Sequence, residues 1–486
     1  MKELKILLLN LPSPPNQDVH RDAAGGFGVA FPRPGNDYGE SMQKGLHPFL
    51  PYAASILSEE GYEFKVLDCQ RLKLNRRETL RFVMKEDPDI IFSLIGLPSM
   101  QKELELLNEI KNAVQNVWIV GVGTVCRTLP DEILLKGGVD IILRNHYPYV
   151  SNMIDLIQAL QGSKGLKSIR GISYAQGENV VHTTETSELE SRALPKPLYD
   201  PIDLDGYQSF IDLTGEKYQY VSVLGSVGCP YPCIYCPYPV GFGRNTVYRP
   251  PKDIVDEIEY LHNVRGIRGF LLRTQSFSLN LKHAEEILDE IIRRKLEIAL
   301  FCEARVDEIT KKLLEKMKKS GCKRVHYGVE TGDPRIIKMA KPGVTLETIR
   351  KAFKITKEVG LWANAHMILG WPDETLESIE NTRKFILELN PDGVNWNFLT
   401  PYPGTKIREI AQKHSLILSN NWSNYTSYTI VMRTKNLTAD QLDKAVKHMI
   451  RNLNRQRMPK MLLQQFRLHN PKQVRRLLNE VKCLFS

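Results

Sequence analysis

The sequence predicts an α/β protein made of two successive α/β regions and a helical C-terminal region. Short apolar stretches of strand length alternate with amphipathic helical stretches over residues 1–162, and the same alternation returns over residues 216–405. Such an alternation predicts parallel sheets whose strands are joined by crossover helices. From residue 406 onward the pattern is mostly helical, and 486 residues are enough for two or three domains.

The first region, residues 1–162, is predicted to form a doubly wound, flavodoxin-like sheet. Its short apolar strands alternate with amphipathic helices, which favours a parallel sheet. The expected strands are Lys5–Leu11, Phe64–Asp68, Ile90–Ile95, Val117–Gly123 and Val139–Arg144. The expected helices are Pro48–Glu60, Arg76–Lys85, Met100–Asn112, Pro130–Leu135 and Tyr149–Leu160.

A ligand of such a sheet is expected at the carboxyl ends of its strands, beside the point where the strand order reverses. Three loops lie there, and small residues in them permit close backbone approach to a ligand. Because the glycine-rich loop does not follow the GxGxxG pattern, a dinucleotide is not indicated. The candidate binding residues are Pro12, Ser13, Gly96, Ser99, Gly121, Gly123 and Thr124.

Residues 163–215 are predicted to connect the two regions. Within them, residues 172–182 have the pattern of a β-hairpin with Gly177 in its turn. The proline-rich stretch from Pro195 to Pro201 then interrupts regular structure.

The second region, residues 216–405, repeats the strand–helix alternation, and its strands end in polar residues. Glu303 and Arg305 end one strand, Glu330 ends the next, and His366 lies near the end of a third. Ionisable side chains at strand ends are candidates for a functional site, although Glu303 and Arg305 could also simply pair with each other. The expected strands are Tyr220–Ser226, Gly269–Arg273, Ile298–Arg305, Arg324–Glu330, Ala363–Leu369 and Val394–Thr400. The expected helices are Ile254–His262, Leu281–Arg294, Lys311–Ser320, Leu346–Val359 and Leu376–Leu389.

One loop carries the strongest chemical signal. Cys229, Cys233 and Cys236 follow the first strand of the second region in a C-x3-C-x2-C pattern. Thiolates select iron–sulfur clusters or zinc over harder cations. A structural zinc site needs a fourth Cys or His close by, and the next histidine, His262, lies within an expected helix. Three cysteines cannot pair off as disulfides, so a cluster with one iron open to a small molecule is predicted.

This loop, with the aromatic Tyr235 before its third cysteine, resembles the signature of the radical S-adenosylmethionine (SAM) superfamily. The resemblance implies a 4Fe–4S cluster whose open iron chelates the amino and carboxylate groups of SAM, with Tyr235 beside the adenine. It also implies a partial (β/α)6 barrel with function at the strand ends. Arg305 is then the candidate partner of the SAM carboxylate, and Glu303 or Glu330 that of the ribose hydroxyls.

The order of the two regions resembles cobalamin-binding radical SAM enzymes, whose N-terminal domain binds cobalamin. The turn after the first strand, the helix that follows His47 and the Gly-Val-Gly loop are typical of that family. The chain departs from it at Arg144–Tyr147, where an acidic element is common, and at Ala23, where the glycine of D-x-H-x-x-G would stand. We therefore expect cobalamin without a histidine on cobalt, although His20 is a candidate. A domain that has lost cobalamin binding is the alternative.

The resemblance implies a methyltransferase that acts on an unactivated carbon or phosphorus centre. One SAM would methylate the cobalamin, and a second would give the 5′-deoxyadenosyl radical that removes a substrate hydrogen. The alternatives are a cobalamin-dependent radical enzyme that catalyses a rearrangement, cyclisation or oxidation, a tRNA-modifying radical SAM enzyme, and a cofactor sensor. No second cysteine trio supports the tRNA-modifying alternative.

Composition and charge indicate in which compartment the protein works and which partners it binds. The net charge of +10 is concentrated toward the C-terminal end, where basic and apolar residues are interleaved. This mixture predicts a helical cap on the barrel, and it also fits a small or amphipathic substrate. No apolar run approaches the roughly 20 residues of a membrane span. We expect a cytoplasmic enzyme with an external electron donor such as flavodoxin or ferredoxin, and no nucleic-acid partner.

Overall fold

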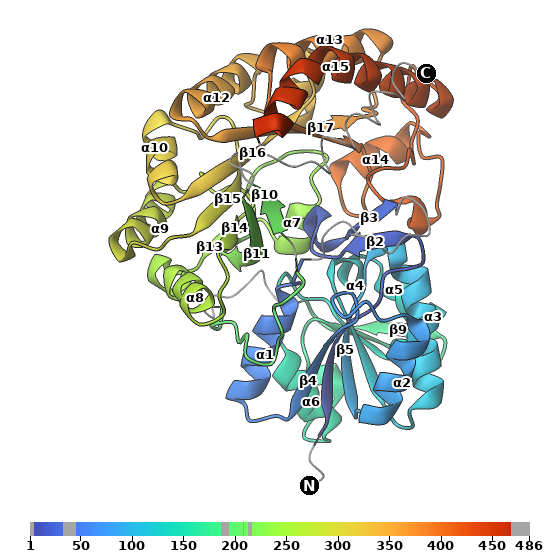
Figure 1. Cartoon of the computed structure of the whole chain (residues 1–486). Coiled ribbons are helices and arrows are strands. Elements are labelled where there is room, and N and C mark those ends of the chain that lie inside the picture. The colour runs from blue at the N-terminus through green and yellow to red at the C-terminus, as the bar shows by residue number, and fades with distance from the viewer. Residues whose placement is uncertain (1–3, 33–44, 186–193, 208, 212–215, 468–486) are drawn as a thin grey trace.

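The computed structural model describes residues 4–32, 45–185, 194–207, 209–211 and 216–467. It contains two seven-stranded sheets with helices packed against them (Figure 1). The larger hydrophobic cluster includes residues of both sheets, from Ile6 in the first to Met367 in the second, so the two halves share a continuous core. The predicted α/β fold class is confirmed.

The first sheet has the strand order β4-β1-β5-β6-β7-β8-β9, and its first five strands are parallel. This is the 2-1-3-4-5 order of a flavodoxin-like doubly wound sheet. The strands are β1 (Ile6–Asn10), β4 (Phe64–Asp68), β5 (Ile90–Leu94), β6 (Trp118–Val122) and β7 (Ile141–Leu143). The helices are α1 (Phe49–Glu59), α2 (Arg76–Glu86), α3 (Met100–Ala113), α4 (Thr124–Thr128), α5 (Pro130–Lys136) and α6 (Met153–Leu160).

Two details of this region differ from the expectation. The hairpin β8 (Ile172–Gln176) and β9 (Asn179–His182) is not an isolated part of the connector, because β8 pairs antiparallel with β7 and extends the first sheet. Helix α6 begins at Met153 rather than at Tyr149, because Tyr149 and Asn152 adopt positive φ angles of 69° and 65°. A left-handed residue cannot continue a right-handed helix.

The second sheet has the order β10-β11-β14-β15-β16-β17-β18, in which the last six strands are parallel. The helices between these strands lie along its outer side (Figure 1). The strands are β10 (Ser209–Ile211), β11 (Lys217–Leu224), β14 (Gly269–Arg273), β15 (Ala299–Ala304), β16 (Cys322–Glu330), β17 (Trp362–Leu369) and β18 (Gly393–Phe398). The helices are α8 (Pro251–Asn263), α9 (Leu281–Arg294), α10 (Lys311–Lys319), α11 (Pro334–Ala340), α12 (Leu346–Val359) and α13 (Leu376–Leu389).

A hairpin near the N-terminus lies where the two halves meet. Strands β2 (Gln17–His20) and β3 (Val29–Pro32) pair antiparallel around the short turn η1 (Ala24–Gly26). Figure 1 shows this hairpin between the first sheet and α14 (Lys406–Lys413). Gly25 has a φ of 66°, and a Cβ there would lie 2.6 Å from the carbonyl oxygen of Pro237. The backbones of the two halves therefore approach each other closely at a position that requires glycine.

The C-terminal region consists of α14, the turn η4 (Trp422–Asn424) and the long helix α15 (Ala439–Arg467). Helix α15 packs along α13 through apolar residues that include Ile379, Leu442 and Met449. Arg457 is buried and donates a hydrogen bond to the carbonyl of Pro391, so it is not part of an exposed basic face. The basic residues Lys472, Arg475 and Arg476 lie outside the described residues. No described helix combines the length and apolar character needed to cross a membrane.

A buried histidine at the start of α1 makes stability depend on pH. His47 packs against the rings of Tyr147 and Tyr149, and its Nδ1 accepts the backbone N–H of Phe49 at 3.1 Å. Burial lowers the pKa of His47 from 6.5 to about 4. The unfolded chain therefore binds one more proton than the folded chain between these pH values, and stability falls as the pH is lowered through this window.

We expect this one group to lower the free energy of unfolding by about 2 kcal/mol between pH 7 and pH 5, at about 1.4 kcal/mol per pH unit below 6.5. Urea unfolding of the protein and of a His47→Gln variant at both pH values measures it, and the variant should show a correspondingly smaller dependence. A His414→Gln variant, altered at an exposed histidine, should behave like the unsubstituted protein. Equal pH dependence in all three proteins would contradict the assignment.

Candidate active site

The three cysteines of the predicted cluster lie on a loop at the carboxyl end of β11. The loop is held by the short strands β12 (Ser226–Val227) and β13 (Val247–Tyr248), and the helix α7 (Tyr238–Phe242) follows it. Gly228 begins the loop with a φ of 94°, and a Cβ there would lie 1.9 Å from the carbonyl oxygen of Asn245. The backbone amide of Ile234 donates to the carbonyl of Ala340, which ties the loop to α11. The loop therefore has a fixed position at the ligand edge of the second sheet.

The thiols of this loop lie close enough to influence one another electrostatically. Cys229 is buried, Cys233 and Cys236 are half-buried, and all three are free. Burial raises the pKa of each thiol, and the neighbouring thiols raise that of Cys236 further. Metal binding must therefore displace protons from them.

Within the described residues, no three His, Cys, Asp or Glu side chains converge on one metal position. A cubane cluster does not require such convergence, because each cysteine binds a different iron. The donor set of three thiols on one fixed loop fits a 4Fe–4S cluster.

Arg305 lies beside this loop. Its guanidinium is 3.6 Å from the centre of the Tyr231 ring, and its Nη1 is 3.6 Å from the Sγ of Cys233. Its Nε and Nη2 donate to the carboxylate of Asp307 at 3.0 and 2.7 Å. The predicted guanidinium is thus next to a cluster cysteine, and its ion-pair partner is Asp307 rather than Glu303.

Glu330 and Tyr235, both predicted to contact SAM, lie together. The Tyr235 hydroxyl donates to Oε1 of Glu330 at 2.6 Å, and its ring packs edge-on against Trp371. Glu330 has a φ of 66°, at a register shift between β16 and β17, and Lys341 Nζ lies 3.4 Å from its carboxylate. The irregular backbone turns the Glu330 carboxylate back over Gly328, where a Cβ would lie 2.2 Å from Oε1. A strained position of this kind is common at functional sites.

The predicted loops of the first sheet lie at its carboxyl edge, and several of their polar groups are engaged within the protein. Arg21, from the hairpin, pairs with Glu103, and both side chains are 2% exposed. The Glu103 carboxylate also accepts the Gly96 backbone amide at 2.8 Å and the Ser99 hydroxyl at 2.5 Å. The Thr124 hydroxyl contacts the carbonyl of Gly25 and the hydroxyl of Tyr149. Of the remaining predicted residues, Pro12 accepts a hydrogen bond from Arg21 through its carbonyl and Ser13 accepts one from the Val19 amide, whereas Gly121 and Gly123 lie against Ile95.

Other buried polar atoms near the junction of the two halves have no hydrogen-bond partner among the described residues. They include the hydroxyls of Tyr147 and Thr274 and both amide atoms of Gln275. Buried polar groups normally have a hydrogen-bond partner, so these atoms indicate one outside the chain. Gly123 has a φ of 132°, and a Cβ there would lie 2.8 Å from the carbonyl oxygen of Ile95. This strand end therefore has no room for a side chain at this position. Free hydrogen-bonding groups beside a strand end without a side chain fit the corrin ring of cobalamin, which carries amide groups around its edge.

Two other candidates have defined places. His20 packs edge-on against Phe31 within the hairpin. His366 pairs with His326, which no sequence pattern singled out. Tyr402, which follows the last strand of the second sheet, is buried, stacks on Phe27 and bonds to Ser427 Oγ at 2.8 Å, so it serves packing. Glu308, also missed, accepts hydrogen bonds from Ser276 and Ser278; its position three residues after Arg305 was the available signal.

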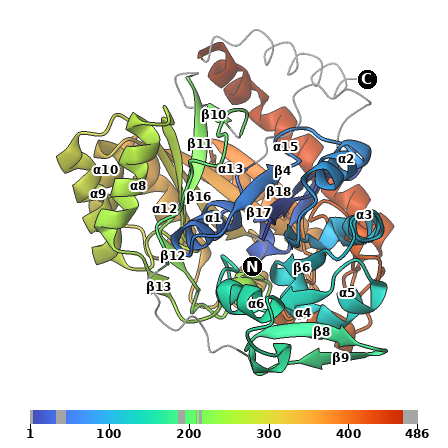
Figure 2. The same cartoon turned by 90° about the horizontal axis from the view of Figure 1, so that it is seen from below.

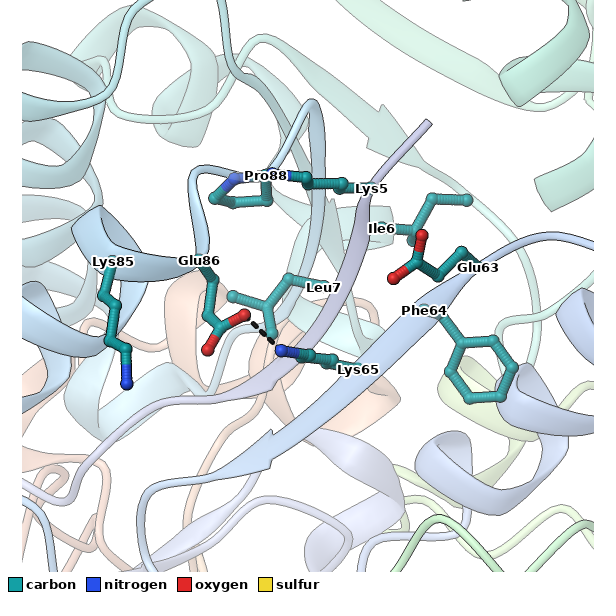
Figure 3. A pocket seen from close by; sticks show the side chains of 9 residues that line it. All are labelled: Lys5, Ile6, Leu7, Glu63, Phe64, Lys65, Lys85, Glu86 and Pro88. Carbon is teal, nitrogen blue, oxygen red and sulfur yellow. Dashed lines mark hydrogen bonds and ion pairs between the residues drawn. The ribbon is translucent and has the colours of Figure 1, made fainter. Parts of the chain in front are cut away.

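A cavity at the opposite end of the first sheet is unrelated to this site. It measures about 180 Å³ and lies beside the amino ends of β1 and β4 (Figure 3). The ion pair between Lys65 and Glu86 crosses it. The chemistry-bearing loops are all at the carboxyl edge, so this cavity has no part in the candidate site.

Comparison with known proteins places these features in a family context. Residues 223–386 match the family model described as the radical SAM superfamily. An uncharacterised methyltransferase of Pyrococcus horikoshii is 29% identical over 82% of this chain and 85% of its own length. The anaerobic magnesium-protoporphyrin IX monomethyl ester cyclase of Cereibacter sphaeroides is 24% identical over 85% of this chain and 68% of its own length.

Two solved structures share the fold across nearly the whole chain. The radical SAM methyltransferase TsrM of Kitasatospora setae, with tryptophan and a SAM analogue bound, has a TM-score of 0.70 and 18% identity, covering 93% of this chain and 89% of its own. The cobalamin-dependent radical SAM enzyme OxsB, with aqua-cobalamin and SAM bound, has a TM-score of 0.73 and 15% identity, covering 99% and 71%.

Proposed function

We propose that this chain, which contains a radical SAM domain, is a cobalamin-dependent radical SAM methyltransferase. The observation that carries the proposal is the fixed three-cysteine loop at the ligand edge of the second sheet, whose following helix α7 contacts α4 at the ligand edge of the flavodoxin-like sheet. Support comes from the radical SAM family match and from a methyltransferase-named relative over most of the chain.

In this proposal the three thiols hold the 4Fe–4S cluster, and SAM binds between Arg305 and Glu330. Arg305 would hold the SAM carboxylate through charge-assisted hydrogen bonds. Glu303 or Glu330 would accept the ribose hydroxyls, and the ring of Tyr235 would lie beside the adenine. When bound, the cluster and SAM supply radical initiation, and cobalamin supplies a carrier for the methyl group.

The cobalamin would lie at the junction of the two sheets. The strand-end residues of the first sheet would approach the corrin through their backbones, while Tyr147, Thr274 and Gln275 would hydrogen bond to its amides. The substrate would be a small molecule held between the two sheets. An external flavodoxin or ferredoxin would deliver electrons, and a reducing cytoplasm suits such a cluster.

Anaerobic purification with added hydroxocobalamin tests the proposal directly. We expect about four irons per chain, one equivalent of cobalamin, and 5′-deoxyadenosine when the reduced protein is given SAM. With methyl-deuterated SAM and a substrate mixture, a product should gain the labelled methyl group. The same iron content without bound cobalamin would indicate a radical SAM enzyme whose N-terminal domain does not bind cobalamin.

A cyclase is the second candidate, because the magnesium-protoporphyrin ester cyclases align over more than four-fifths of this chain. A cyclase would consume SAM and give 5′-deoxyadenosine without adding the label to the product. Product mass therefore separates the two reactions.

Replacement of Arg305 should weaken SAM binding without removing the cluster. A hydrogen bond to a charged group contributes about 1.5–3 kcal/mol, so Arg305→Leu should raise the Kd for SAM about 10- to 100-fold. The Kd of Arg305→Lys for SAM should lie between that of the unsubstituted protein and that of Arg305→Leu, because an ammonium cannot bond in a bidentate manner. Equilibrium dialysis of SAM against the reconstituted protein measures the effect.

Iron content is the internal control for Arg305→Leu, and Arg268→Leu, at an exposed arginine, is the matched variant. An unaltered SAM affinity of Arg305→Leu would show that this residue does not bind SAM.

A further inference from the structure

The inner face of the second sheet carries polar residues toward its carboxyl end, whereas its outer face is apolar. Along β16, Val325, Tyr327 and Val329 are buried in the core shared with the helices, whereas the residues between them are partly exposed. Strand β17 repeats the pattern, with His366 partly exposed between Ala365 and Met367. Successive side chains of a strand point to opposite faces, so the partly exposed residues line the concave side of the sheet.

Aromatic residues form the lower layer of this concave face. The strand register aligns Phe301, Arg324 and Trp362 on three adjacent strands. The guanidinium of Arg324 lies 4.3 Å from the Trp362 ring centre, and Tyr220 packs edge-on against Phe301 at 4.7 Å. Phe301 is buried and the Arg324 guanidinium lies over the Trp362 ring, so these residues form a packed aromatic layer toward the amino end of the sheet.

Polar residues form the next layers toward the carboxyl end. The register places Glu303 beside His326 and His326 beside Asn364, and it places His366 between Gly328 and Asn395. Gly328 lies directly beneath the Glu330 carboxylate. The polar layers are therefore adjacent to the place proposed for SAM.

The two histidines form a hydrogen-bonded pair. His326 Nδ1 lies 2.9 Å from His366 Nε2, and such a bond needs one N–H and one lone pair. Burial lowers the pKa of both rings, which favours two neutral imidazoles. His326 Nε2 and Asn364 Oδ1 are buried and have no hydrogen-bond partner within the part of the chain that the structure describes. Each neutral imidazole carries one N–H, which can be on either of its two ring nitrogens. The pair can therefore present either a donor or an acceptor to a ligand.

Glu303 adds an acceptor with no partner of its own. Its side chain is half-buried, and among the described residues its carboxylate receives no hydrogen bond and forms no ion pair. It is near enough to His366 and Arg273 to influence both electrostatically. A ligand without hydrogen-bond donors would cover this carboxylate and the imidazole pair and leave them unsatisfied, which is unfavourable.

We propose that this concave face, with the His326–His366 pair, Glu303 and Asn395 above an aromatic layer, binds the substrate, and that the substrate is a flat polar molecule bearing an N–H or O–H donor. The inference rests on the proposed function, leaves Glu330 as the acceptor of the SAM ribose hydroxyls, and specifies the substrate class of that site. It excludes a plain hydrocarbon, which the polar layers would reject because a site built to hydrogen bond discriminates strongly against analogues that lack the group.

Two probes of equal size test this inference. Indole carries an N–H in a flat bicyclic ring, and indene replaces that N–H with CH2. We expect equilibrium dialysis against the reconstituted protein with SAM present to show at least about tenfold tighter binding of indole, the equivalent of one good hydrogen bond. Equal binding of the two probes, or no binding of either at millimolar concentration, would overturn the proposal.

Substitutions test whether the preference for indole over indene arises at the concave face. His366→Phe should abolish the preference for indole, and Asn395→Leu, at an exposed strand position that tolerates substitution, should reduce it. His414→Phe, at an exposed histidine outside this face, should retain it. An unchanged preference in both His366→Phe and Asn395→Leu would place the probe elsewhere and contradict the proposal.

The unsubstituted protein separates this inference from the function on which it rests. Formation of 5′-deoxyadenosine from SAM by the reduced protein, with no probe present, reports the proposed cluster chemistry. If SAM is cleaved but indole and indene bind equally, only the substrate inference fails. If SAM is not cleaved, the proposed function fails regardless of the probes.

Discussion

Replacing Cys236 with serine is expected to abolish SAM cleavage and to lower the iron content of the purified protein. Cys236 is the third thiol of the loop and lies among groups that already raise its pKa. Serine is a much harder ligand with a far higher pKa, so one iron of the cubane would lose its protein ligand. We expect 5′-deoxyadenosine to fall below detection, measured by chromatography of reactions with reduced protein and SAM.

Cys69→Ser is the matched control for this experiment. Cys69 is a buried cysteine in the core of the first region, and its thiol bonds only to Thr79 among the described residues. It should retain full iron and SAM cleavage, whatever stability it loses. A Cys236→Ser protein with four irons and normal cleavage would show that this loop does not carry the cluster.

Removal of the Glu103 carboxylate is expected to destabilise the first region by about 3–5 kcal/mol, the usual penalty for breaking a buried ion pair on one side. Glu103→Ala would leave the guanidinium of Arg21, 2% exposed, without its charge partner. It would also free the Ser99 hydroxyl and the Gly96 amide at the ligand edge. Urea unfolding followed by circular dichroism measures the loss.

Glu105→Ala tests the same helix at a partly exposed position, where Lys102 and Arg76 form ion pairs with this carboxylate near the surface. Such pairs contribute about 0–1 kcal/mol, so this variant should unfold close to the unsubstituted protein. Similar losses in Glu103→Ala and Glu105→Ala would contradict a special role for the buried pair. If the buried pair also shapes the cobalamin edge, Glu103→Ala should retain less cobalamin even below its unfolding transition.

The three-cysteine loop and the succession of strands and helices along the chain were predictable because both depend on short-range spacing. Cys229 and Cys236 are separated by few residues, and their chemistry follows from that spacing. The apolar periodicity of each strand and helix is likewise local, so it predicted the elements and the ligand edges of both sheets. The pairing of β8 with β7 was missed because a hairpin pattern does not reveal which neighbouring strand its edge will meet.

The partners of the site residues were decided by the tertiary structure. Glu303 and Arg305 share one side of a strand, yet Arg305 turns to Asp307, which a local pattern could not distinguish from pairing with Glu303. Arg21 meets Glu103 across 82 residues of sequence, and His326 meets His366 across 40. These contacts depend on strand register and on the packing of the hairpin between the two halves. The sequence by itself therefore determined the class of the fold and predicted the chemistry of the three-cysteine loop, whereas only three-dimensional packing determined which polar groups are satisfied and which remain for a ligand.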